Sequence, residues 1–115
     1  MGEVLTGTKT DAVLLEVLEE RKRQDDKWKQ QNHPPIEYCA ILGEEVGEVN
    51  KSALEGHFGY PYKAIGQDGY TVRYDPSTEE AKLAHYREYR KELIQVAAVA
   101  VAMFESLDRN ELNNQ

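Results

Sequence analysis

The chain has 115 residues and a formal net charge of −7, with 21 acidic side chains against 14 basic ones. This length predicts one domain with a modest hydrophobic core, and the acidic surface argues against binding duplex nucleic acid, whose phosphates it would repel. The only cysteine, Cys39, excludes an intrachain disulfide and suits a reducing compartment. No signal peptide is visible, and no apolar stretch approaches the ~20 residues of a membrane span, so we expect a cytoplasmic protein without a membrane partner.

Residues 1–10 are small and polar and predict a flexible tail, followed by a single domain over residues 11–115. A first helix is expected over residues 11–28, and the Pro-Pro pair that follows suits the first turn of a second helix. That helix is expected over residues 35–55, with Gly56 as its C-terminal residue.

Residues 57–77 are rich in glycine, proline and tyrosine, which sets them apart from the helical segments. Short strands at 63–65 and 70–74, joined through Gln67-Asp68-Gly69, predict a β-hairpin insertion, because Asp-Gly favours a tight hairpin turn. The tyrosines offer stacking surface for a lid near a site, but the same composition serves a mobile surface loop equally well.

A third, long helix is expected from a cap at Ser77 or Thr78 to about Asp108. Between residues 93 and 104 only Gln95 is polar, so this segment must be covered on most sides. The three helices of one chain provide too little apolar surface to bury this segment. The sequence therefore predicts an all-α helical bundle completed by dimerisation.

Carboxylates fall at the edge of apolar faces on two of these helices. At 100° per residue, Glu45 lies on the apolar face of the second helix and Glu48 lies at its border. On the third helix, Glu92 and Gln95 lie at the edge of the apolar segment. Burying carboxylates without compensation costs several kcal/mol, and oxygen ligands of this kind suit Mg²⁺ or Mn²⁺ rather than Zn²⁺. Helical glutamates are also commonly solvated or paired with lysine or arginine, so the spacing alone leaves both interpretations open.

The first helix carries a stripe that starts apolar, becomes charged and ends in the only tryptophan, formed by Leu14, Leu18, Arg21, Asp25 and Trp28. A polar insertion in a core-facing stripe can mark a site. Alternatively, the helix leaves the core at its charged end and Trp28 caps the core.

The run Ile41–Val49 (ILGEEVGEV) resembles the E-E-x-G-E signature of MazG-like, all-α nucleoside triphosphate pyrophosphohydrolases. Trp28 followed by Asn-His-Pro at 32–34 is similar to members of that superfamily, and the segment 90–104 is similar to the second-motif helix of phage and bacterial MazG-like proteins. The resemblance covers residues 14–108 except for the 57–77 region.

This resemblance implies Mg²⁺-dependent hydrolysis of nucleoside triphosphates to a monophosphate and pyrophosphate, with Mn²⁺ as an alternative metal. Glu45 and Glu48 match the first ligand pair and Glu92 matches the third ligand, whereas Gln95 stands where the family has aspartate. A glutamine oxygen can coordinate the metal but adds no charge, which places turnover in question. Glu44 joins Glu45 and Glu48 as a catalytic carboxylate that can orient the attacking water.

The resemblance also implies a nucleoside triphosphate substrate and assembly as a homodimer or a dimer of dimers. Trp28 is expected to stack on the base, and Lys51, Arg87, Arg90 or Lys91 to contact phosphate oxygens. Two other functions compete with the enzyme: a catalytically weak relative that binds a nucleotide or metal as a regulator, and a structural helical dimer that docks a protein partner.

Overall fold

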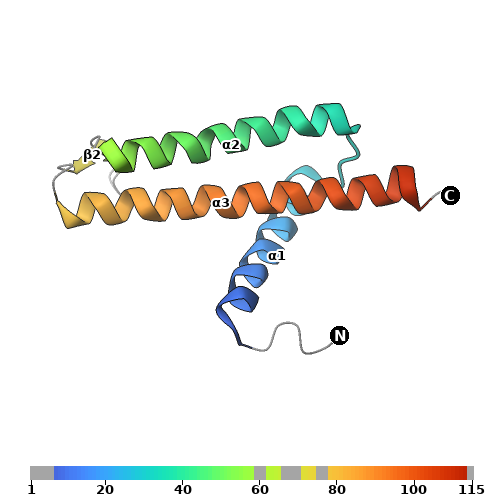
Figure 1. Ribbon diagram of the computed structural model, residues 1–115, viewed down its shortest axis with the longest axis horizontal. Coiled ribbons are helices and arrows are strands. Elements are labelled where there is room, and N and C mark those ends of the chain that lie inside the picture. The colour runs from blue at the N-terminus through green and yellow to red at the C-terminus, as the bar shows by residue number, and fades with distance from the viewer. Residues whose placement is uncertain (1–6, 59–61, 66–70, 75–77, 114–115) are drawn as a thin grey trace. The chain divides into compact units, whose positions relative to one another are not determined.

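A computed structural model describes residues 7–58, 62–65, 71–74 and 78–113 (Figure 1). The chain is mainly helical, as the sequence predicts, with α1 at Lys9–Trp28, α2 at Pro35–Phe58, α3 at Glu79–Leu107 and a short π-helix, η1, at Asp108–Leu112. Two short strands, β1 at Tyr62–Ile65 and β2 at Thr71–Tyr74, lie between α2 and α3 in the sequence. Within the described ranges, no helix is long and apolar enough to cross a membrane.

The chain divides into two compact units. The first combines Met1–Glu45 with Ile94–Gln115, and the second is Val46–Leu93. The first unit therefore holds α1, the beginning of α2, the end of α3 and η1, and the second holds the remainder of α2 and α3 with the strands between them.

α1 begins at a complete capping box. The Asp11 amide donates to the Thr8 hydroxyl at 3.0 Å, and the Thr8 amide donates to the Asp11 carboxylate at 3.3 Å. These bonds satisfy amide groups that the first helical turn leaves without partners. The predicted tail over residues 1–10 is therefore wrong for its last residues: the helix starts at Lys9 rather than Asp11, whereas residues 1–6 lie outside the described residues.

α2 continues three residues beyond the predicted range of 35–55, through Gly56 to Phe58. Gly56 does not terminate the helix, because its backbone lies close to α3 within the second unit. A Cβ atom built on Gly56 would be 3.2 Å from the Cβ of His85, a side chain that is buried. The glycine therefore allows close helix packing. The prediction that it ends the helix was wrong, because it relied only on the general preference for glycine at helix C-termini.

α3 begins as predicted, because the Thr78 hydroxyl accepts a hydrogen bond from the Ala81 amide at 3.1 Å. At its other end the backbone changes to a π-helix, where the Asn113 amide donates to the Asp108 carbonyl at 2.7 Å. This change was not predicted, because residues 108–112 carry no proline or glycine that would mark a break in the helix. Single π-turns often accompany functional sites.

The predicted hairpin is confirmed in its strands. β1 and β2 pair in antiparallel register, with Tyr62 opposite Tyr74 and Ile65 opposite Thr71. The predicted turn at Gln67-Asp68-Gly69 lies outside the described residues.

The core of the first unit is small. Val17, Tyr38, Ala98 and Val99 are its buried hydrophobic side chains among the described residues. The neighbouring side chains on the same helices are only partly buried or exposed, and two pockets lie within this unit.

Candidate functional site

The candidate site is a polar pocket of about 550 Å³ that lies wholly within the first unit. α1, the connection from α1 to α2, the first turns of α2, the last turns of α3 and η1 all contribute to its walls. Its charged lining comprises three cations and three carboxylates, namely Arg21, Lys29, Arg109, Asp25, Glu45 and Glu105. The pocket is thus close to neutral, although the chain as a whole is acidic.

The wall from α1 consists of the charged end of the predicted stripe. Arg21, Asp25 and Trp28 follow one another at helical spacing, and all three line the pocket. Trp28 is 58% exposed, so it does not cap the core. Its ring lies 4.8 Å from the ammonium group of Lys27 in a cation–π contact. An indole with an open face beside charged groups is suited to stacking on a planar ring.

Arg21 connects α1 to α3. Its guanidinium donates to the Glu105 carboxylate at 2.5 and 3.0 Å and to the Asp25 carboxylate at 3.2 Å. Burial alone would lower the pKa of Arg21, but the hydrogen bond to Glu105 and the charges of Glu105 and Asp25 outweigh it, so its pKa is raised. Arg21 therefore remains a cation and holds two of the pocket's three carboxylates in place.

The connection between α1 and α2 is held by η1. Arg109 donates to the Asn32 side-chain oxygen at 2.9 and 3.2 Å and to the Gln31 carbonyl at 3.3 Å. Asn110 donates to the same Asn32 oxygen at 3.0 Å. The buried Tyr38 completes the arrangement, since its hydroxyl donates to the Gln31 carbonyl at 3.1 Å. The π-turn thus brings two consecutive polar side chains to a single asparagine.

Of the residues that the sequence singled out as a site, Trp28 and Glu45 line this pocket. Glu45 is half-buried, while its neighbours Glu44 and Glu48 on α2 are exposed. Glu44 and Gln95 are not lining residues, and six others belong to the second unit, namely Glu48, Lys51, Arg87, Arg90, Lys91 and Glu92. The charged pocket residues that sequence reasoning missed are Lys29, Glu105 and Arg109.

No group of three or more His, Cys, Asp or Glu side chains among the described residues is arranged to hold a metal ion. Mg²⁺ does not require such a cage, because proteins commonly hold it through one or two carboxylates together with phosphate oxygens of a substrate. Glu45, half-buried in the pocket wall, offers an oxygen donor of that type. The donor chemistry therefore fits Mg²⁺ that arrives bound to a polyphosphate.

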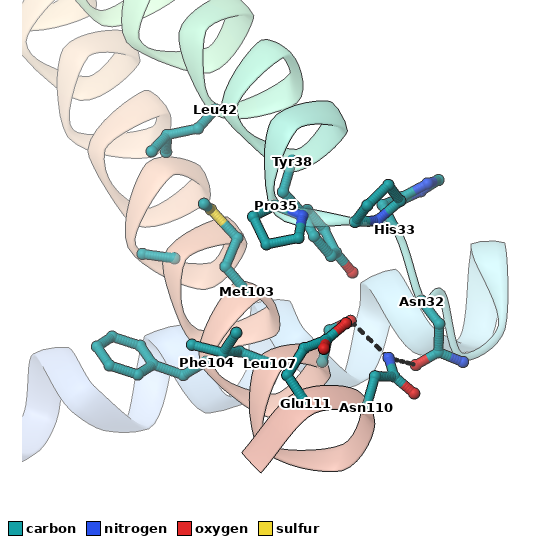
Figure 2. Close-up of a pocket in the computed structure, with 13 residues that line it drawn as sticks. Asn32, His33, Pro35, Tyr38, Leu42, Met103, Phe104, Leu107, Asn110 and Glu111 are labelled. Carbon is teal, nitrogen blue, oxygen red and sulfur yellow. Dashed lines mark hydrogen bonds between the residues drawn. The ribbon is translucent and has the colours of Figure 1, made fainter.

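A second pocket of about 490 Å³ lies in the same unit and is mainly apolar (Figure 2). Leu42, Met103, Phe104 and Leu107 contribute apolar surface to it. Figure 2 also shows Asn110 at its polar end, where the side-chain amide donates to Asn32 and, at 3.1 Å, to the Ser106 hydroxyl. This pocket contains a single carboxylate, that of Glu111, and no lysine or arginine, so it is poorly suited to a polyphosphate.

Searches against protein-family models, curated proteins and solved structures found no match to this chain.

Proposed function

We propose that this protein hydrolyses a nucleoside triphosphate to a monophosphate and pyrophosphate with Mg²⁺, and that the nucleotide binds in the polar pocket of the first unit. The observation that carries the proposal is that Trp28 and Glu45, from different helices, line one pocket together with three cationic side chains. A nucleotide requires these chemical types together: a flat apolar surface for the base, cations for the phosphates and carboxylates for a metal.

The charge balance of the pocket also suits a metal–nucleotide complex. Three cations face three carboxylates, so the protein alone offers no net positive charge to a free triphosphate. A bound divalent cation changes this balance, because it neutralises phosphate charge and is attracted to the carboxylates. When bound, Mg²⁺ would polarise the phosphate and lower the charge that develops as the bond to pyrophosphate breaks.

The residues of the chain take separate parts in this proposal. Trp28 stacks on the base, and Arg109, which also hydrogen-bonds the α1–α2 connection, presents its positive charge to the phosphates. Glu45 supplies a metal ligand from the pocket wall, whereas Glu48, Glu92 and Gln95 are ligands that only the family resemblance implies. For the carboxylate that orients or deprotonates the attacking water, the family resemblance implies Glu44, which is exposed on α2 and does not line the pocket.

We also propose that the functional unit is at least a homodimer. The apolar segment of α3 remains partly open: Phe104 is 69% exposed, Leu93 40% and Val101 37%. On α2, Ile36 is 78% exposed. Large apolar side chains exposed in this number are typical of a surface that another chain covers.

One alternative is favoured by a particular observation. Gln95 lacks the charge of the family's aspartate. This feature suits a protein that binds a nucleotide and does not turn it over. This regulatory relative would bind the same molecules in the same pocket.

A pyrophosphate-release screen tests the proposal. The purified protein is incubated with each common and modified nucleoside triphosphate, with Mg²⁺ and separately with Mn²⁺. Release of pyrophosphate with an equimolar monophosphate is the expected result for at least one nucleotide. Binding without release would favour the regulatory alternative, and the absence of both would contradict the proposed function.

A further inference from the structure

The backbone of Lys29 adopts a conformation that side chains disfavour. Lys29 follows the last residue of α1, with φ at 64° and ψ at −177°. Glycine occupies this region freely, whereas other residues reach it at a cost because their Cβ atom meets the backbone. Within the described ranges, Lys29 is the only residue other than glycine with a positive φ.

A hydrogen bond holds this conformation. The Lys29 amide donates to the Asp25 carbonyl at 2.8 Å and so closes the last turn of α1. The hydrogen bond itself is common at helix ends, but ψ near 180° takes Lys29 out of the left-handed helical region and into one that essentially only glycine occupies. Glycine at position 29 would give the same helix end without strain, so the demands of folding do not explain the lysine.

Lys29 lies beside Trp28 in the wall of the polar pocket. Of the pocket's other two cations, Arg21 is paired with Glu105 and Asp25, and Arg109 donates to Asn32 and Gln31. No ion pair to the Lys29 ammonium is found among the described residues. Of the three pocket cations, Lys29 is therefore the one that can move to meet an anionic ligand without first breaking an ion pair or side-chain hydrogen bond to another described residue.

We propose that Lys29 is a substrate-binding residue whose ammonium contacts the phosphates of the nucleotide, and that its strained backbone is retained because it directs this cation at the pocket. The inference rests on the proposed nucleotide site and adds a residue that neither the helical spacing nor the family motif identifies. Strained backbone conformations persist where the surrounding structure and function hold them.

Two substitutions separate strain from charge. Lys29→Gly removes both, so it should raise the melting temperature by about 2–6 °C and weaken nucleotide binding about tenfold. Lys29→Ala removes the charge but keeps a Cβ atom, so it should weaken binding equally without the gain in melting temperature. Lys29→Arg should keep most of the affinity. Lys82→Ala, which removes an exposed lysine of α3 that does not line the pocket, is the control and should leave affinity unchanged.

Binding is measured with α,β-methylene analogues of the common deoxynucleoside triphosphates in the presence of Mg²⁺. The fluorescence of Trp28, the only tryptophan, reports occupancy of the pocket, and calorimetry provides an independent value. A wild-type protein that binds no analogue would overturn both the proposed function and this inference. Wild-type binding with unchanged affinity in Lys29→Gly would overturn the role of Lys29 alone. A lower melting temperature in Lys29→Gly would overturn the argument that the lysine is retained at the expense of stability.

Discussion

At the scale of single residues, the polar pocket is shaped by side chains that are already engaged with one another. The side chain of Arg21 is 12% exposed and forms ion pairs with Glu105 and Asp25. These three residues therefore mainly stabilise the structure of the pocket. Trp28 and Lys29 are exposed residues of the same wall that take no part in these ion pairs. Residues that hold the pocket and residues that meet a ligand can therefore be separated by mutation.

Trp28→Ala should weaken nucleotide binding about tenfold or more, because stacking on an aromatic ring is worth about 1–3 kcal/mol per base. The free energy of unfolding should change by less than about 1 kcal/mol, since the side chain is 58% exposed. Calorimetric titration and urea denaturation measure the two effects. Tyr86→Ala, an aromatic residue of α3 that is also 58% exposed, is the matched control. A large loss of stability in Trp28→Ala would indicate a structural role instead.

At the scale of elements, the α1–α2 connection depends on η1. The Asn32 side-chain oxygen accepts from Arg109 and from Asn110, so three bonds end on one atom. Asn32→Ala should lower the free energy of unfolding by about 1–2 kcal/mol, because two donors lose their acceptor at a partly exposed position. Urea denaturation checks this, with Asn50→Ala on the exposed face of α2 as the control. Equal stability of the two variants would contradict the role assigned to η1.

Helix boundaries show what the sequence revealed and what it did not. Caps are local, so the start of α3 at Thr78 was predicted, and the capping box at Thr8 and Asp11 could have been found from its spacing. The role of Gly56 was predicted wrongly, because the glycine is needed for close packing against His85. That residue is distant in the sequence, so the local pattern does not indicate the contact. The same limit applies to the pocket: helical spacing identified Trp28 and Glu45, whereas Arg109 enters through a π-turn and Lys29 through an unusual backbone angle.

At the scale of the whole molecule, the exposed apolar side chains of α3 predict self-association. Phe104→Glu should shift the protein from dimer toward monomer, because a charge at the centre of an apolar interface is costly to bury. Sedimentation equilibrium at micromolar concentration measures the change. Lys82→Glu, which alters charge at an exposed position of the same helix, should leave the assembly unaltered. A wild-type chain that remains monomeric at 13.1 kDa would contradict the dimer.

The central claim is that Glu45 belongs to a site that hydrolyses nucleoside triphosphates. Glu45→Gln keeps the size and hydrogen-bonding ability of the side chain but removes its charge, and Glu19→Gln makes the same change at an exposed position of α1 that does not line the pocket.

The measurement is the rate of pyrophosphate release with Mg²⁺ and the best nucleotide of the screen, for the wild type and both variants. We predict that Glu45→Gln lowers the rate by at least about a hundredfold, in the range typical of a lost catalytic group, and that Glu19→Gln retains the wild-type rate. Equal rates for the wild type and Glu45→Gln would contradict the account.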